Sequence, residues 1–261
     1  MPEDILMEIK KDYVLSKIRD GERIDGRKFD EIRPIEIQTG LIAKAEGSAL
    51  VKLGNTMVVA GVKMQPGEPF PDTPDQGIII TNAELVPLAS PTFEPGPPDE
   101  NAIELARVVD RGIRHSEAVD LKELCIEEGE KVWVIFIDIW ALDDDGNLMD
   151  ASALAAIAAL MNTTVPAERF EVGEDFPLAV KDLPVAITSL VFEDKILVDP
   201  CLDELSIGKN TITITTDQND NIVSIQKSGP FLLKEEVFDR LIDLSIEKAK
   251  EVRRILKNIN S

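Results

Sequence analysis

The chain has 261 residues, of which 44% are hydrophobic, a length and composition typical of a globular protein with one large or two small domains. Its 49 acidic residues outnumber its 28 basic ones and give a formal net charge of −21, which argues against a protein that binds nucleic acid unaided, because cations that neutralise phosphates supply most of such affinity. A single histidine and two distant cysteines, Cys125 and Cys201, argue against a zinc site and predict two buried, reduced thiols.

The chain begins with a predicted helix over residues 1–19, where apolar residues recur near helical spacing. The turn-forming dipeptide Asp25-Gly26 follows, and Arg27 comes directly after it. Two interpretations of this tripeptide are open. It is a plain turn, or Arg27 fixes a contact between domains or subunits.

A series of strands is expected next, at residues 35–38, 48–53, 56–62 and 78–81. The dipeptide Gly54-Asn55 between two of them strongly indicates a β-hairpin. Residues 65–76 and 87–98 are rich in proline and are therefore expected to be loops. Loops of this length in a compact domain are usually functional or lie at an interface.

A helix is predicted over residues 100–116, with Asp99 as its N-cap. Arg107, Arg111 and Arg114 follow one another by four and three residues, so their side chains project from one helix face. Arg107 and Arg111 are like charges one turn apart, which is unfavourable unless an anion lies near them.

The same helix carries acids that could neutralise these arginines. Glu104 can reach Arg107, and Asp110 can pair with Arg114. One interpretation of the helix face is therefore a solvated surface of mixed charge. His115 is expected at the helix end, where a cation interacts favourably with the helix dipole, and we assign it no catalytic role.

A long apolar run at residues 132–140 predicts a buried strand, followed by an acidic turn at residues 143–146 and an alanine-rich helix from about residue 150 that should pack closely against a sheet. A strand, a tight turn and a helix N-terminus form a natural anion site, because the first helical N–H groups lack partners. This turn, however, carries three aspartates and no lysine or arginine, and Leu148 and Met149 lie where an anion needs donors. The sequence predicts the geometry of a phosphate cradle without its chemistry.

The remaining chain repeats the order of strands followed by a helix. An irregular acidic crossing at residues 168–182 is followed by predicted strands and a closing amphipathic helix, at residues 185–191, 195–198, 211–215, 222–226 and 233–257. Because the β-then-α pattern occurs both before and after about residue 180, we expect a duplicated α/β unit whose halves pack into one body.

Several short motifs resemble, in order and spacing, those of the RNase PH family of phosphorolytic exoribonucleases. They are Asp25-Gly26-Arg27, Gly47-Ser48-Ala49, Gly54-Asn55-Thr56, and Asp145-Gly146 followed by Ala151-Ser152. Active members of this family carry a Thr/Ser-Arg pair that holds the attacking phosphate, and the pair falls on Leu148 and Met149 here. Within the family the chain is most similar to the non-catalytic ring subunit of the archaeal exosome, over roughly residues 24 to 255.

The resemblance also locates the family's catalytic aspartate, which follows an acidic element that Asp199 and residues 203–204 resemble. Residues 206–208, Ser-Ile-Gly, hold its place and offer no acid, and we interpret Asp199 as a turn or cap residue. Phosphorolysis needs donors on the phosphate and a carboxylate that acts as a general acid or places a metal. The resemblance therefore implies a chain without catalytic residues, metal or cofactor.

The fold implied by the resemblance is α/β (α+β): an RNase PH-like fold of duplicated ribosomal protein S5 domain 2-like βα units, with N- and C-terminal helices. We expect an N-terminal helical extension at residues 1–30, a first domain at 31–182 and a second at 183–261. The implied partners are a catalytic RNase PH-like subunit, in a ring of three alternating heterodimers, together with RNA-binding cap subunits and single-stranded RNA.

In such a ring the chain would shape the active site of its partner and help to bind RNA for 3′-to-5′ phosphorolysis. Arg107, Arg111 and Arg114 would form a stripe along the RNA backbone, because their helix resembles the RNA-contacting helix of the family. One alternative is an active exoribonuclease of the same family, which the missing phosphate-binding pair and the missing acid disfavour. Another is a stand-alone RNA-binding module, which conflicts with the net charge.

A cytoplasmic location is expected. No signal peptide opens the sequence, and no apolar run is long enough to cross a bilayer.

Overall fold

The computed structural model describes residues 2–208 and 210–259, with side chains from Lys10 onward. Met1, the first residue of the predicted N-terminal helix, lies outside the described residues; the rest of that helix is present. The helices are α1 (Pro2–Asp20), α2 (Glu100–His115), α3 (Leu148–Met161), α4 (Leu202–Leu205) and α5 (Glu235–Lys257), with a 3₁₀ turn, η1 (Glu168–Phe170). None of the helices in this part of the chain is both long and apolar enough to cross a membrane.

The first sheet is built around β6, a long strand that pairs on both sides. Its strands, in spatial order, are β1 (Ile35–Thr39), β2 (Gly47–Leu53), β3 (Thr56–Gly67), β6 (Lys131–Asp143) and β4 (Ile78–Leu85), and β5 (Cys125–Glu127) also pairs with β6. All pairs are antiparallel except β4 with β6. The predicted hairpin is confirmed, because Leu53 pairs with Thr56 across Gly54-Asn55.

Two strands of this sheet are longer than predicted. β3 was expected to end at residue 62 and ends at Gly67, and β4 was expected to end at residue 81 and ends at Leu85. Both added stretches are paired with β6, so backbone hydrogen bonds to a long central strand extend them into polar sequence. The proline-rich loop after β3 is correspondingly shorter than predicted.

The second sheet comes from the second half of the chain and is antiparallel throughout. Its order is β10 (Lys195–Val198), β9 (Val185–Phe192), β11 (Thr211–Thr216) and β12 (Ile222–Ser228). β9 is buried along almost its whole length, because α3 packs on one of its faces and α5 on the other.

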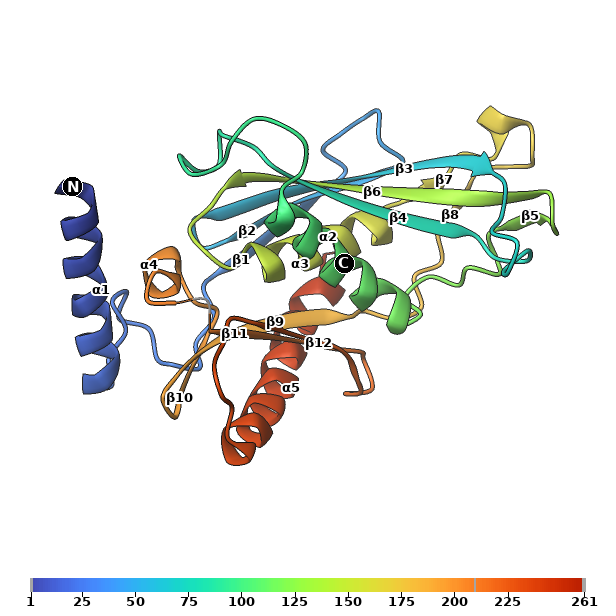
Figure 1. Cartoon of the computed structure of the whole chain (residues 1–261). Helices are drawn as coiled ribbons and strands as arrows, with labels where there is room; N and C mark the ends of the chain where they lie inside the picture. The colour runs from blue at the N-terminus through green and yellow to red at the C-terminus, as the bar shows by residue number, and fades with distance from the viewer. Residues whose placement is uncertain (1, 209, 260–261) are drawn as a thin grey trace.

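The two sheets enclose a layer of helices (Figure 1). α3 contacts β2 and β3 of the first sheet and β9 of the second, and α2 packs beside it against β4 and β12. From Ala155 to Leu160 every residue of α3 is fully buried. The small side chains of α3 allow both sheets to approach it closely, which confirms the predicted packing and the mixed α/β class.

The crossing between the two halves contains more structure than predicted. Within residues 168–182 the chain forms η1, the second strand of a short hairpin, β7 (Thr164–Val165) with β8 (Phe176–Pro177), and a bridge between Val119 and Val180. Helix α4 was not predicted, because four residues are too few to show a helical period.

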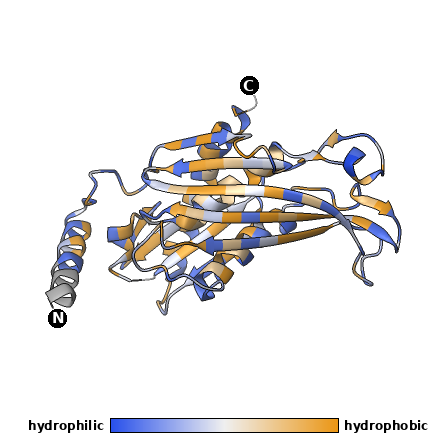
Figure 2. Ribbon diagram, turned by 90° about the horizontal axis from the view of Figure 1, so that it is seen from above, coloured by the Kyte–Doolittle hydropathy of each residue, from blue (hydrophilic) through white to orange (hydrophobic). Residues whose placement is uncertain are grey.

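Helix α1 stands beside the main body (Figures 1 and 2). It reaches the second sheet through Val14 and Ile18, which form a small buried cluster with Leu190 and Leu197.

The prediction of two buried thiols is right for Cys201 and wrong for Cys125. Both cysteines are reduced, but Cys125 is only half-buried. It lies on β5, which pairs on one side only.

Candidate functional site

The turn between β6 and α3 packs against the loop that follows β10. Gly146 has φ +87, and a Cβ atom there would lie 2.5 Å from the backbone nitrogen of Leu202. Asn147 caps α3 in the left-handed conformation, and its side chain accepts from the N–H of Asp150. Only glycine satisfies both the conformation and the space at position 146.

Arg33 approaches this turn, but it binds backbone carbonyls. Its Nη1 donates to the carbonyl of Asp145 at 2.8 Å, and its Nη2 donates to that of Gly146 at 3.0 Å. The Thr56 hydroxyl donates to the same Gly146 carbonyl at 2.7 Å. The guanidinium therefore stabilises the backbone of the turn, and its N–H groups are not available to a ligand.

Asp199 is the main partner of that arginine and is fully buried. It accepts from Nε and Nη2 of Arg33 at 2.9 and 2.7 Å, from Nη1 of Arg27 at 3.0 Å and from Nδ2 of Asn147 at 2.8 Å. Burial alone would raise the pKa of Asp199, but hydrogen bonds and charge from Arg33 hold that pKa below its ordinary value. A carboxylate with these partners has no free lone pair for a proton or a metal.

The interpretation of Asp199 as a turn or cap residue describes its backbone but misses the role of its carboxylate. Its φ of 49° places it in a turn, but its carboxylate joins the N-terminal segment, the β6–α3 turn and the second sheet. Arg27 is part of this junction, which supports the interpretation that it fixes a contact between parts of the chain. The sequence carries no signal for these pairs, because Arg33 and Asp199 are separated by 166 positions.

A second buried carboxylate, Asp150, lies at the start of α3. It accepts from the Thr188 hydroxyl at 2.7 Å, from the Thr188 N–H at 2.9 Å and from Asn147 Nδ2 at 2.8 Å. Burial raises the pKa of Asp150 to about 7, against the opposing effect of these hydrogen bonds. None of its bonded partners is a cation.

A further buried ion pair escaped the sequence analysis. Arg23 donates from Nε to Glu204 at 2.8 Å, and both side chains are fully buried. Glu204 belongs to the acidic element after β10, and this contact gives it a structural role. Ser206, which begins the segment in place of the family's catalytic acid, donates its hydroxyl to the Asp203 carbonyl.

The site therefore has the strand, turn and helix N-terminus of an anion cradle, but the described residues place no free cation in it. Leu148 and Met149, the first two residues of α3, are half-buried and pack against the main core. Arg23, Arg27 and Arg33 are all bound to acids and carbonyls. Within the described residues, no group of three or more His, Cys, Asp and Glu side chains could hold a metal ion.

Arg107, Arg111 and Arg114, the residues of the predicted stripe, all lie on α2, and Asp99 caps this helix as expected. Arg107 is exposed and makes no hydrogen bond or ion pair through its side chain within the part of the chain that the structure describes. Arg111 is half-buried and donates from Nη2 to Gln226 at 2.8 Å. Arg114 pairs with Asp110 at 2.7 Å, as predicted, and also donates to the Ile79 carbonyl.

On the same helix, Glu104 differs from the prediction and His115 agrees with it. Glu104 does not pair with Arg107; it accepts from Gln226 and from Ser228 on β12. The reason is that β12 packs against this side of α2, which the helical period alone does not show. His115 ends the helix as expected, with its Nδ1 3.1 Å from the Val223 carbonyl.

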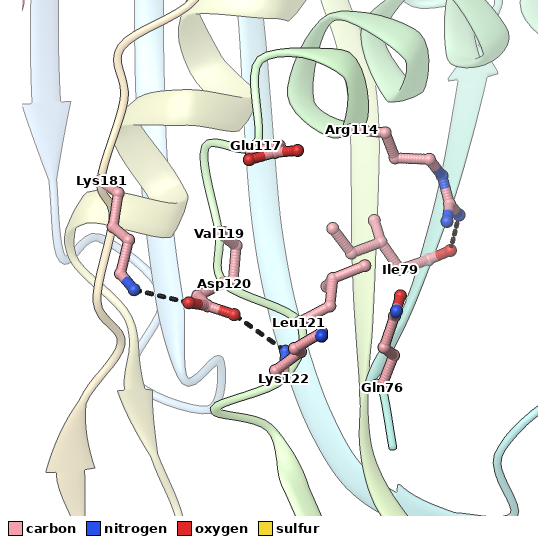
Figure 3. A pocket seen from close by; sticks show the side chains of 9 residues that line it. All are labelled: Gln76, Ile79, Arg114, Glu117, Val119, Asp120, Leu121, Lys122 and Lys181. Carbon is pink, nitrogen blue, oxygen red and sulfur yellow. Dashed lines mark hydrogen bonds and ion pairs between the residues drawn. The ribbon is translucent and has the colours of Figure 1, made fainter. Parts of the chain in front are cut away.

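Beyond Arg114 the surface is hollowed, with a volume of about 380 Å³ (Figure 3). Lys181 on the far side of the hollow is paired with Asp120 at 2.6 Å. The lining combines apolar side chains with charges of both signs, so it does not form a basic surface continuous with the stripe.

Comparisons with known proteins agree on one family. The models of the first and second domains of the 3′ exoribonuclease family (RNase PH) match residues 31–166 and 182–248. The chain is 71% identical over 259 residues to the exosome complex component Rrp42 of Archaeoglobus fulgidus, which covers 99% of this chain and 100% of that relative. The Rrp42 protein of Methanocella arvoryzae is 55% identical over 259 residues, with the same coverage.

A solved structure of a related protein has the same fold. One chain of the Archaeoglobus fulgidus exosome with RNA bound to the active site has a TM-score of 0.94 and 71% identity, covering 96% of this chain and 98% of that one.

Proposed function

The chain belongs to the 3′ exoribonuclease family, or RNase PH family, and on this basis we propose that it is a non-catalytic subunit of an archaeal exosome ring. In this role it shapes the active site of a catalytic RNase PH-like partner and helps to bind single-stranded RNA. Three such heterodimers alternate around the ring, and RNA-binding cap subunits cover one of its faces. The names of the relatives and of the matching structure support this assembly.

The observation that carries the proposal is the state of the β6–α3 turn. Its neighbouring cation, Arg33, is bound to the carboxylate of Asp199 and to two carbonyls of the turn. Drawing Arg33 away from Asp199 would break a buried ion pair and leave Arg27 as the remaining cation bound to that carboxylate among the described residues, which is unfavourable. An incoming phosphate would therefore find Asp144 and Asp145 in the turn, Asp143 directly before it, and no available cation among the described residues.

The contribution to RNA binding comes from the arginine stripe. Within the described residues, the Arg107 side chain has no intramolecular partner, and the Arg111 side chain has only neutral ones. Both are therefore available to RNA phosphates, which they would bind without reading the base sequence. Arg114 contributes less, because Asp110 already neutralises it.

The domain division and the location are part of the same proposal. We divide the chain into an N-terminal extension at residues 1–30, a first domain at 31–182 and a second at 183–261, and the spans of the two family models support this division. A cytoplasmic site of action fits the absence of a membrane-spanning helix among the described residues.

The test is phosphate-dependent degradation of poly(A), measured for this chain alone, for the catalytic partner alone and for the mixture. We expect no release of nucleoside diphosphates by the chain alone, and more release by the mixture than by the partner alone. Release by the isolated chain above a mock preparation would contradict the proposal, and so would a mixture no more active than the partner.

A further inference from the structure

Helix α2 and the edge strand β12 lie side by side and run in opposite directions (Figure 1). A row of polar contacts joins them, and we call its members the α2–β12 seam: Glu104, Arg111 and His115 on the helix, and Val223, Gln226 and Ser228 on the strand. The seam connects the first half of the chain, which carries the arginine stripe, to the second half.

Gln226 binds a cation and an anion at the same time. Its Oε1 accepts from Nη2 of Arg111 at 2.8 Å, and its Nε2 donates to Oε1 of Glu104 at 2.8 Å. Because a guanidinium only donates and an ionised carboxylate only accepts, these two bonds determine which way the amide faces. Ser228 donates to the same carboxylate oxygen at 2.9 Å and so holds Glu104 in place.

The amide in turn holds Arg111. Besides Gln226, the guanidinium has only one contact among the described residues, a long one from Nε to the Arg107 carbonyl at 3.4 Å. Its Nη1 group has no partner among the described residues and can still bind an anion. A long side chain that is already held in its binding conformation loses less entropy when a ligand arrives. The neutral amide also leaves the charge of Arg111 undiminished, unlike the carboxylate that pairs with Arg114.

We propose that Gln226 is a positioning residue, which holds Arg111 in the conformation that meets a phosphate of single-stranded RNA. Through Gln226 the second half of the chain becomes part of an RNA site whose charges lie on the first half. This inference rests on the proposed function, in which Arg111 contacts RNA.

The first test replaces Gln226 with methionine, which keeps the length of the side chain and removes both hydrogen bonds. In the assembled ring, Gln226→Met should weaken binding to single-stranded RNA about threefold to tenfold, the cost of ordering one long side chain. The slope of log K against log salt should not change, because Arg111 still reaches its phosphate in the complex. For long RNA, KM should rise by a similar factor while kcat stays the same.

The second test, Gln226→Glu, keeps an acceptor for Arg111 but adds a negative charge. Arg111 should then be neutralised, so the salt slope should fall by about 0.7 in addition to the loss of affinity. The contrast between an unchanged slope and a reduced slope separates positioning from charge. Gln218→Met is the matched control, because its amide binds the Lys181 carbonyl and no member of the α2–β12 seam, and it should leave RNA binding unchanged.

Arg111→Ala distinguishes failure of this inference from failure of the proposed function. If Arg111→Ala weakens RNA binding and Gln226→Met binds RNA as tightly as the wild type, the positioning role is wrong and the proposed function stands. If Arg111→Ala itself has no effect, the RNA contact by Arg111 is wrong as well. In the Arg111→Ala background Gln226→Met should add nothing, and a further loss of affinity would overturn the inference.

Discussion

At the residue scale, two buried carboxylates of the same region behave in opposite ways. Asp199 is paired with Arg33, which lowers its pKa, whereas Asp150 has only Thr188 and Asn147 as side-chain partners among the described residues, and burial raises its pKa to about 7. Asn147 donates to both carboxylates, so it lies between a charged acid and an acid that is easily protonated. Whether a buried acid has a cation beside it thus decides its ionisation.

Asp150 gives a prediction about pH and stability. Its raised pKa means that the folded state holds the proton more tightly than the unfolded state. The protonated carboxyl therefore stabilises the fold fully below about pH 4, and this stabilisation is lost as pH rises through about 7. Asp150→Asn should remove this loss, which is at most about 4 kcal/mol. Urea unfolding at pH 5 and pH 8 should show a smaller decline of stability for the variant than for the wild type.

Replacement of the exposed carboxylate of Asp143 by the amide, Asp143→Asn, is the control for this measurement and should follow the wild-type profile. Equal declines for Asp150→Asn and the wild type would contradict the assignment.

Restoring the phosphate-binding pair at the start of α3 should not restore catalysis. Leu148→Thr with Met149→Arg supplies a hydroxyl and a cation, but residues 206–208 still offer no acid and Asp199 stays bound to Arg33. We therefore expect no phosphate-dependent degradation of poly(A) by the double variant alone. Activity above the level of the wild-type chain would show that the missing pair is the only defect.

At the element scale, α3 and its preceding turn link the two halves of the chain. The helix is buried between both sheets, and the turn touches the loop at Leu202, whose N–H donates to the Asp145 carbonyl at 3.0 Å. Alanine-rich sequence makes the close packing of α3 possible, and Gly146 makes the close approach of the turn possible. The turn is therefore a structural junction between the two halves.

This junction predicts a large effect for Gly146→Ala. The alanine would have to keep the positive φ of Gly146, which is unfavourable for a residue with a side chain. Its Cβ would also lie 2.5 Å from the Leu202 nitrogen, so the backbone would have to shift. We expect a loss of more than about 2 kcal/mol in the free energy of unfolding. Gly129→Ala has a similar φ of +78 but no atom within 4 Å, so it should cost only about 1 kcal/mol. Similar losses in the two variants, measured by urea unfolding, would show that the turn tolerates the contact.

At the scale of the whole molecule, the charge of −21 and the proposed binding of RNA have to be reconciled. A strongly acidic chain repels phosphates, so RNA must be held by a local group of cations together with a less acidic partner. In the proposed function, Arg107 and Arg111 supply the local group, and the ring supplies the partner.

The arginine stripe predicts a defined dependence on salt. In the assembled ring, Arg107→Ala with Arg111→Ala should weaken binding to all single-stranded RNA sequences about equally. The slope of log K against log salt should fall by about 0.7 for each phosphate contact that is lost. RNA titrations at several salt concentrations measure both quantities. Arg114→Ala is the comparison and should have a smaller effect, because Asp110 pairs with Arg114. An unchanged slope and affinity would show that these arginines belong to a solvated surface of mixed charge and do not bind RNA.

Assembly itself is the other prediction at this scale. Co-expression with the catalytic partner should give a species of about six subunits, because the proposed non-catalytic role requires the chain to act through its surfaces. Light scattering after size exclusion measures the mass. A monodisperse monomer that ignores the partner at micromolar concentration would contradict the proposed ring.

The sequence by itself determined most of the elements and the residue types of the β6–α3 turn. Hydrophobic periodicity indicated the main strands and helices, because burial of one face repeats along the chain. The Gly54-Asn55 hairpin, the Asp99 cap and the Asp110–Arg114 pair are local contacts, and all three are present. The unsuitability of the β6–α3 turn for a phosphate also follows from adjacent residues, above all Leu148 and Met149.

Only the tertiary structure decided the contacts between distant parts of the chain. The pairing of Arg33 with Asp199, of Arg23 with Glu204 and of Arg111 with Gln226 joins residues more than a hundred positions apart. Local periodicity reports whether a position is buried but not which residue it meets, and polar residues scattered in loops show no period at all. The packing of two sheets around α2 and α3 selects those partners, because every buried charge has to be compensated wherever the fold brings it.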